Sequence, residues 1–211
     1  MSARLFPPGV PVSKRVFDLL VVIPGLVLIS PLLLVISLWL LITQGWPVFF
    51  TQPRGGLGGS VFHIYKFRTM REPPPGADPL KSDAQRLTPA GRFLRATSLD
   101  ELPELWNVLR GEMSLVGPRP LMARYLTRYT PEQARRHEVL PGITGWAQIN
   151  GRNALTWEDK FALDVWYVDH WSFWLDLQIL ARTLVKVVQR EGISQPGQAT
   201  AEEFMGTAGR D

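Results

Sequence analysis

The chain has 211 residues, of which 45% are hydrophobic and 20% charged, and its formal net charge is +4. This length suits one domain with a substantial core, and this composition excludes a chain that is disordered throughout. The sequence contains no Cys, which excludes disulfides, thiol chemistry and cysteine-bound metals.

The longest uncharged stretch runs from Leu19 to Ile42 and would extend about 36 Å as a helix. A cleaved signal peptide fits poorly because the run is too long and no small-residue cleavage site follows it. A helix in a soluble core would need protein on every side. We therefore expect this segment to lie in lipid. The excess of basic residues and the eight Trp suit a membrane surface, whereas a nucleic-acid-binding protein would have no use for the apolar run.

Two topologies stay open for the apolar segment, because it can span the bilayer once or enter and turn back. Pro31 removes a backbone donor, and the Ser30 hydroxyl can bond to a freed carbonyl, so we expect a kink there. Basic residues flank both ends, and the positive-inside rule places both flanks in the cytoplasm. A bent hairpin satisfies that rule. A kinked single span is the alternative.

The sequence after the apolar segment predicts a soluble domain that begins with a β-hairpin. We expect its turn at Gly55 to Gly59 and its second strand at Val61 to Thr69. Lys66 and Arg68 would project from the same face of that strand, which suits either a solvated edge or a phosphate clamp. The stretch Glu72 to Asp83, rich in Pro, Gly and charge, is predicted to be a loop.

The stretch TSLDELPELW places the adjacent carboxylates Asp100 and Glu101 where a helix is expected to begin. Ser98 and Glu101 match a capping box with Pro103 in the first turn, and Asp100 would complement the helix dipole. A helix start that favours negative charge also binds phosphate or a metal ion. The pattern thus leaves capping and chemistry as alternatives.

The segment VGPRPL favours a binding site near these carboxylates. Prolines on both sides restrict the backbone of Arg119 and hold its guanidinium in one place. A planar fork that is held rigidly suits a pair of phosphate oxygens, while a plain loop with an exposed Arg is the ordinary alternative. Arg95 is a second basic residue that could gather near the same carboxylates.

Two helices are predicted near the C-terminus, at Trp157 to Asp169 and at Trp171 to Gln189. In the second, Arg182, Lys186 and Arg190 are four residues apart and line one stripe beside apolar side chains. That pattern is typical of a helix on a membrane surface, and packing against the domain core is an equally common alternative.

These features together resemble the bacterial sugar transferase family, in its small monotopic polyprenyl-phosphate phosphoglycosyl transferase form (PglC type). The resemblance runs from Lys14 to about Gly206. Any one motif alone would be weak, but the set is highly specific. The motifs that carry it are KRVFD, SP within the apolar segment, FTQPRGG, YKFRTM, SLDELPELWNVLRGEMSLVGPRPL, PGITGWAQINGRN and ALDVWYVDHWSFWLDLQI.

The resemblance implies an α+β, mostly helical fold with amphipathic interfacial helices and a small β-hairpin. It implies a monotopic protein at the cytoplasmic face of the bacterial inner membrane, with a re-entrant helix hairpin broken at Ser30 and Pro31. The expected parts are a membrane segment at 1–44, a cytoplasmic catalytic domain at 45–193 and a tail at 194–211. In the tail we expect at most a short ordered segment around Phe204.

The activity that the resemblance implies is transfer of a phosphosugar from a UDP-sugar to a polyprenyl (undecaprenyl) phosphate, with release of UMP. This is the first membrane step of glycoconjugate and exopolysaccharide assembly. The catalytic dyad falls on Asp100 and Glu101, with Asp100 forming a covalent aspartyl-phosphosugar intermediate and Mg²⁺ held at both residues. Independently, a carboxylate near Arg residues at a helix start is expected to stay ionised and to attack phosphorus.

The resemblance also assigns substrate contacts outside the dyad. Lys66 and Arg119 match positions near the phosphates, and Asp164 and Asp176 match acidic positions of less defined role. Arg68 and Arg95 could bind phosphate or serve structure; the substrate-binding set is thus Lys66, Arg68, Arg95, Arg119, Asp164 and Asp176. The competing interpretation is a non-catalytic, membrane-anchored basic scaffold. The sequence does not specify the sugar, the acceptor length, the glycan pathway or the oligomeric state, for which a homodimer is one option.

Overall fold

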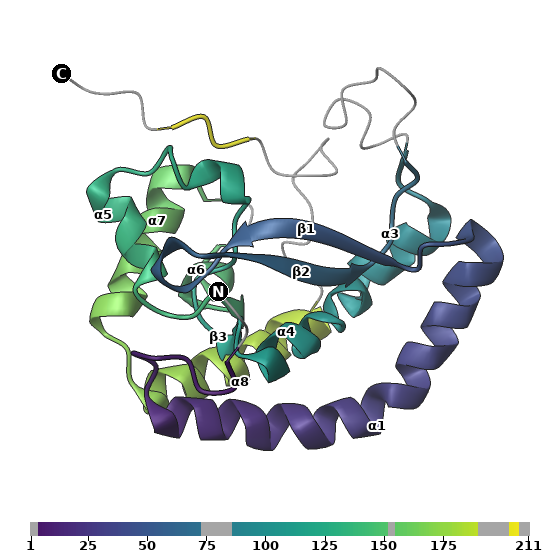
Figure 1. Cartoon of the computed structure of the whole chain (residues 1–211), viewed down its shortest axis with the longest axis horizontal. Coiled ribbons are helices and arrows are strands. Elements are labelled where there is room, and N and C mark those ends of the chain that lie inside the picture. The colour runs from purple at the N-terminus through teal and green to yellow at the C-terminus, as the bar shows by residue number, and fades with distance from the viewer. Residues whose placement is uncertain (1–3, 73–85, 152–154, 190–202, 207–211) are drawn as a thin grey trace.

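A long bent helix and a largely helical domain make up the fold (Figure 1). The computed structural model describes residues 4–72, 86–151, 155–189 and 203–206. The long helix is α1 (Val12–Gln44), and it lies along one side of the domain. The predicted hairpin is confirmed: β1 (Phe49–Gly55) pairs antiparallel with β2 (Val61–Phe67) around the turn η1 (Leu57–Gly59). Most of the loop predicted at 72–83 lies outside the described residues.

The remaining elements are short helices, two three-residue strands and two longer C-terminal helices. In chain order they are α3 (Pro89–Ala96), η2 (Leu99–Glu101), α4 (Glu104–Arg110), β3 (Ser114–Val116), η3 (Ala123–Tyr125), α5 (Pro131–Ala134), η4 (Arg135–His137), β4 (Gly142–Thr144), α6 (Trp146–Ile149), α7 (Trp157–Asp169) and α8 (Phe173–Gln189). Both predicted C-terminal helices are confirmed. The parallel pair of β3 and β4 was not predicted, because three-residue buried strands show no alternation of apolar and polar side chains.

Both ends of α1 pack against the domain. Val22, near the N-terminal end, belongs to the main core together with Ile179 of α8. Ile36 and Leu40, near the C-terminal end, pack in a second cluster with Leu94 of α3. The helix is therefore attached to the same domain at two places.

The middle of α1 is left uncovered. Only 11% of the most apolar 18-residue stretch of α1 is buried, and the side chains of Val27 and Leu28 are 71% and 82% exposed. The helix continues through both of its prolines and bends partway along its length, as Figure 1 shows. The Ser30 hydroxyl donates to the carbonyl of Val27 at 2.8 Å, the carbonyl that Pro31 cannot bond. The expected compensation at Ser30 and Pro31 is thus present, within one continuous helix that is long and apolar enough to cross a membrane.

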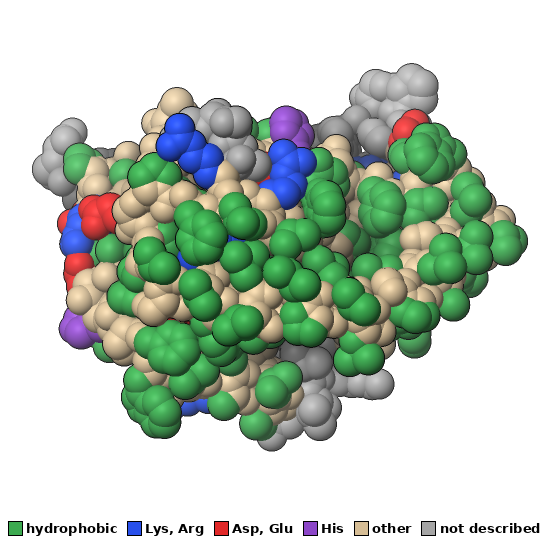
Figure 2. Space-filling view, turned by 60° about the horizontal axis from the view of Figure 1, so that its bottom comes forward, with side chains coloured by type: hydrophobic (Ala, Val, Ile, Leu, Met, Phe, Trp, Pro, Cys, Tyr) green, Lys and Arg blue, Asp and Glu red, His purple; other side chains and the backbone are tan. Residues whose placement is uncertain are grey.

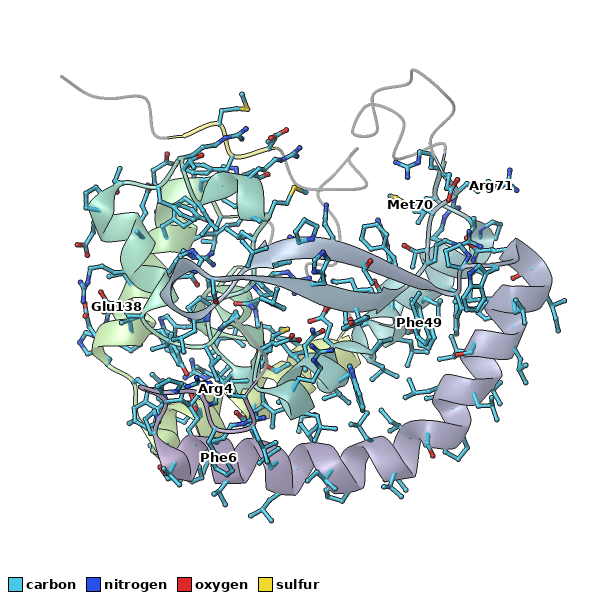
Figure 3. The ribbon with its side chains drawn as sticks, in the orientation of Figure 1. Arg4, Phe6, Phe49, Met70, Arg71 and Glu138 are labelled. Atoms are coloured by element: carbon cyan, nitrogen blue, oxygen red, sulfur yellow. The ribbon has the colours of Figure 1, made fainter. Side chains whose placement is uncertain are left out.

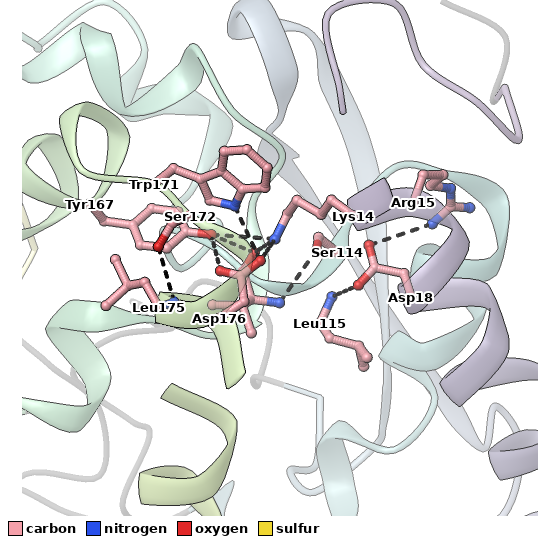
Figure 4. Close-up of polar contacts among 11 residues, drawn as sticks. Lys14, Arg15, Asp18, Ser114, Leu115, Tyr167, Trp171, Ser172, Leu175 and Asp176 are labelled. Carbon is pink, nitrogen blue, oxygen red and sulfur yellow. Dashed lines mark hydrogen bonds and ion pairs between the residues drawn. The ribbon is translucent and has the colours of Figure 1, made fainter. Parts of the chain in front are cut away.

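A buried ion pair ties the N-terminal end of α1 to the domain (Figure 4). Lys14 Nζ lies 2.5 Å from Asp176 Oδ2 and donates to the carbonyl of Val116 at 2.9 Å. The Tyr167 hydroxyl and the Trp171 indole N–H donate to the same carboxylate at 2.7 and 3.2 Å. The side chains of Lys14 and Asp176 are 5% and 3% exposed. Asp176 therefore joins α1, α7 and α8, and Lys14 extends the connection to β3.

The described part of the C-terminal tail is anchored by one aromatic residue. Phe204 is 2% exposed, and its backbone carbonyl accepts a hydrogen bond from Arg128 at 2.5 Å. The neighbouring Glu203 pairs with Arg128 at 3.0 Å. The short ordered segment expected around Phe204 is confirmed. It packs among Tyr125, Tyr129, Trp157 and Phe161.

We expect Asp176→Asn to lower the free energy of unfolding by about 3 kcal/mol, because it leaves the buried Lys14 charge without its carboxylate. Denaturant unfolding in detergent micelles measures this. The matched control is Asp169→Asn, which breaks an ion pair between Asp169 and Arg135 whose side chains are 43% and 33% exposed, and which we expect to cost less than about 1 kcal/mol. Equal effects of the two substitutions would contradict this role for Asp176.

Candidate functional site

Asp100 and Glu101 lie in the short 3₁₀ turn η2. Helix α4 begins after them at Glu104, with Pro103 at its N-cap. Ser98 has a left-handed backbone conformation, with φ of 56°, and its side chain makes no capping hydrogen bond. The capping box predicted from the sequence is therefore wrong. The left-handed residue separates η2 from α3, and this conformation is costly for a residue other than Gly.

Glu101 is fixed by two cations instead of by a helix cap. Its Oε1 atom lies 2.7 Å from Lys66 Nζ and also pairs with the guanidinium of Arg119. Burial alone would raise the pKa of Glu101, but the charges and hydrogen bonds of Arg119 and Lys66 outweigh it and hold that pKa well below its usual range. The structure thus brings Lys66 and Arg119, both expected near the substrate phosphates, into direct contact with Glu101.

Asp100 has a different environment from its neighbour. Its side chain accepts no hydrogen bond from any residue that the structure describes, although the residue is only 8% exposed. Burial and the charge of Glu101 raise its pKa above the ordinary 3.8, and the charges of Lys66, Arg95 and Arg119 oppose that rise. The charges of the neighbouring Arg residues thus act in the expected direction, toward the ionised form of Asp100, while burial and Glu101 act against them. Of the two carboxylates, Asp100 has its oxygens available.

A small cavity lies beside this pair of carboxylates and reveals two charged residues that the sequence analysis did not assign. Its volume is about 20 Å³, enough for one water molecule or ion. Glu104, which is 1% exposed, lines it at 3.0 Å from Lys66, and burial raises its pKa. The residues that line the cavity are Arg54, Ile64, Lys66, Glu104, Arg119 and Pro120.

Arg54 is the second unassigned residue, and it enters the cavity from β1. Its guanidinium donates to Gln52 Oε1 at 2.6 Å and to the Pro120 carbonyl at 3.2 Å. Burial and the charge of Arg119 lower its pKa to about 10. Gln52 pairs with Ile64 in the hairpin, and Arg54 and Lys66 each lie two residues further along their own strands, so their side chains share one face of the sheet. This shared face could have identified Arg54 as a site residue, but the sequence of the turn alone did not fix the strand register.

Arg68 and Arg95 bind other parts of the chain. Arg68 donates to the carbonyl of Gln44, the last residue of α1, at 2.5 Å, and to the next carbonyl at 2.6 Å. Lys66 and Arg68 thus bind different partners: Lys66 pairs with Glu101, whereas Arg68, one residue beyond the end of β2, binds the end of α1. Arg95 donates to the Thr69 hydroxyl at 3.0 Å, while its charge acts on the dyad.

Asp164 acts on the site through an intermediate residue. Its Oδ2 atom accepts from Arg136 at 2.7 and 3.0 Å, and the two side chains are 5% and 2% exposed. Arg136 in turn donates to the backbone carbonyl of Arg119 at 2.7 Å. Neither Asp164 nor Asp176 lines the cavity. We conclude that Asp164 positions the Arg119 loop, and the sequence offered no pattern that pairs it with Arg136.

Asp100 and Glu101 were both expected to hold Mg²⁺, and their surroundings suit that role for Asp100 more than for Glu101. Among the described residues there is no group of three or more His, Asp or Glu side chains arranged to hold a metal ion. Mg²⁺ is commonly held by one or two carboxylates together with substrate phosphates, and the unbonded Asp100 suits that role. Glu101 is already engaged by two cations, so it suits that role less well.

Comparisons with known proteins agree on one family. Residues 10–190 match the sequence pattern of the bacterial sugar transferases. The chain is 55% identical to the protein named uncharacterized sugar transferase EpsL of Bacillus subtilis, over 93% of this chain and 97% of that protein.

Two further relatives have names that specify a reaction. One is a UDP-glucose:undecaprenyl-phosphate glucose-1-phosphate transferase of Caulobacter vibrioides, 43% identical over 83% of this chain and 70% of that protein. The other is an undecaprenyl-phosphate galactose phosphotransferase of Salmonella typhimurium, 40% identical over 85% of this chain. This chain spans only 41% of the length of the Salmonella protein.

We expect Glu101→Gln to lower the pKa of Asp100, because it removes a neighbouring negative charge and frees Lys66 and Arg119 to act on Asp100. Carbon NMR of protein labelled at aspartate carboxyl groups measures this titration, with Asp100→Asn identifying the signal. Glu112→Gln, at a residue that pairs with Arg110 at 3.2 Å, is the control and should leave the pKa unchanged. A rise of the Asp100 pKa in Glu101→Gln would contradict the described charge arrangement.

Proposed function

The chain belongs to the bacterial sugar transferase family, and from that premise we propose that it transfers a phosphosugar from a UDP-sugar to a polyprenyl phosphate. The relatives named for UDP-glucose or galactose and undecaprenyl phosphate support this donor and acceptor class. The proposal depends mainly on one observation, which is that two adjacent carboxylates differ in their bonding partners. Glu101 is bound by two cations, while Asp100 accepts no hydrogen bond from the described residues.

The reaction we propose has two displacements at the same phosphorus. In the first, an Asp100 oxygen bonds to the sugar-bearing phosphorus of the UDP-sugar, and the bond from that phosphorus to the bridging oxygen breaks, so that UMP leaves. In the second, an oxygen of the polyprenyl phosphate attacks the phosphosugar on Asp100 and releases the carboxylate. The product is a polyprenyl-diphosphate sugar. A covalent intermediate lets one compact site meet a soluble nucleotide and a lipid in turn.

The basic residues around the cavity orient the diphosphate in this proposal. Arg119 presents a planar fork whose backbone is held by Arg136, and Lys66 supplies a point charge beside it. Both already bind Glu101, so Glu101 keeps them in place before the substrate arrives. Arg54 adds a third cation from the opposite strand of the hairpin.

Charge balance supports Mg²⁺ at the same site. Four basic residues and three carboxylates surround the site, which gives it a formal charge of +1. The diphosphate of a UDP-sugar brings two negative charges, so the occupied site would have a net negative charge without a metal ion. These residues are Arg54, Lys66, Arg95, Arg119, Asp100, Glu101 and Glu104. We propose that Asp100 and the substrate oxygens hold Mg²⁺, which would neutralise charge on the departing UMP.

We also propose that α1 is re-entrant and that the domain lies at the cytoplasmic face of the inner membrane. The two ends of α1 are attached to the same domain, and its uncovered middle is apolar. Figure 2 shows hydrophobic side chains over much of the face that α1 forms. In α8, Trp174 and Leu184 are 67% and 70% exposed, so an interfacial helix there fits the same membrane surface.

The first half of the reaction gives the most direct test. Purified protein mixed with the correct UDP-sugar and Mg²⁺, but without acceptor, should release UMP and gain the mass of one phosphosugar in intact-protein mass spectrometry. Asp100→Asn should show neither, whereas the surface control Asp169→Asn should behave as the wild type. A screen of UDP-sugars identifies the donor.

Two outcomes would contradict this proposal. If UMP appears only in the presence of polyprenyl phosphate and no adduct forms under any condition, the transfer is direct and Asp100 is not a nucleophile. If no UDP-sugar yields UMP with or without acceptor, a membrane-anchored binding protein becomes the better description.

A further inference from the structure

A second and larger cavity lies at the C-terminal end of α1. Its volume is about 620 Å³, and Arg68 and Arg71 line it from the strand side. Figure 3 shows Arg71 beyond the end of the β-hairpin, on the side where α1 ends, with Phe49 near the same end of the hairpin. Trp39 and Gln44 line it from α1, and Trp46 follows that helix. None of these residues lines the smaller cavity beside Glu101.

The position of this cavity places it at the level of lipid headgroups if α1 lies in lipid. The uncharged run of α1 ends at Ile42, and the cavity surrounds the residues just after it. Trp39 and Trp46 are 37% and 80% exposed, and neither indole N–H has a hydrogen-bond partner in the described chain. Trp side chains prefer the boundary between hydrocarbon and water, where the ring is apolar and the N–H finds a polar partner.

The charges of the cavity suit one phosphate group. Arg68 is fixed by the last carbonyls of α1, so it offsets the negative end of that helix. The guanidinium of Arg71 has no partner among the described residues, and Glu72 is the carboxylate that lines the cavity. Two Arg and one Glu leave one positive charge, which a singly charged phosphate would balance. The Gln44 side-chain amide is also buried there without a partner in the described chain.

We infer that this cavity binds the phosphate of a membrane lipid, with Arg71 pairing with the phosphate and the two Trp rings contacting the first carbons of the lipid chain. The inference rests on the proposed function for the identity of one candidate lipid, the polyprenyl phosphate acceptor, which the cavity holds on arrival, before its phosphate moves on to react at Asp100. An anionic phospholipid carries the same chemistry. The cavity is distinct from the reactive carboxylate, because α3 begins at the cavity with Pro89 and extends about 12 Å before the turn that contains Asp100.

The acceptor arm of the test separates the two half-reactions. In Arg71→Gln, formation of the phosphosugar adduct without acceptor should match the wild type. Consumption of that adduct should need about tenfold more polyprenyl phosphate, the usual effect of losing one charge-assisted hydrogen bond. Trp46→Ala, at an exposed residue, should act in the same direction. Arg92→Gln is the matched control, because Arg92 is exposed on α3 and does not line the cavity.

The phospholipid arm uses native mass spectrometry of the protein with phosphatidylglycerol or phosphatidylcholine. If the occupant is a bulk phospholipid, wild type retains phosphatidylglycerol in preference to phosphatidylcholine, and Arg71→Gln loses that preference while its acceptor dependence is unchanged. A change in either arm supports the cavity and identifies its ligand. If Arg71→Gln and Trp46→Ala match Arg92→Gln in both arms, the inference is overturned. A wild type that forms no adduct would contradict the proposed function instead, and the phospholipid arm alone would then decide this inference.

Discussion

The structure depends on one constraint, which is that an apolar helix with an uncovered middle is attached to a single polar domain at both of its ends. At the N-terminal end the attachment is the buried pair of Lys14 and Asp176, and at the C-terminal end Arg68 binds the last carbonyls of α1. Lipid is the medium that suits the uncovered middle, while the attached domain carries the charged residues. In the re-entrant arrangement that we propose, the domain lies along one surface of the membrane, and the larger cavity, at the C-terminal end of α1, lies at that surface.

The candidate site shows how a buried charge network can select one of two adjacent carboxylates. Glu101 is fixed by ion pairs with two cations. The oxygens of Asp100 accept no hydrogen bond from the described residues, and burial raises the pKa of Asp100. Arg119 is itself held from outside the site, because Asp164 binds Arg136 and Arg136 binds the backbone of Arg119. Removing one member of such a chain leaves the next buried charge uncompensated, which makes the network costly to disrupt.

The sequence predicted those features that arise from periodicity and turn chemistry. The hairpin, α7, α8 and the apolar run follow from such patterns, and the adjacency of the dyad is visible in the chain itself. The capping box failed because Ser98 has a left-handed backbone conformation, which the local pattern did not indicate. Arg54 and Glu104 were missed because their convergence on Lys66 depends on strand register and on how α4 packs against β2. Asp176 was assigned to substrate, although the partner that holds it, Lys14, lies at the opposite end of the sequence.

The sidedness of the two flanks of α1 tests the re-entrant arrangement most directly. The chain has no Cys, so Leu5→Cys and Val61→Cys each introduce one unique thiol, at side chains that are 51% and 52% exposed. Labelling with a membrane-impermeant maleimide in inverted and right-side-out membrane vesicles gives the side of each thiol. The account predicts that both thiols are labelled only from the cytoplasmic side. Labelling of the two thiols from opposite sides would mean that α1 spans the bilayer, and it would contradict the account.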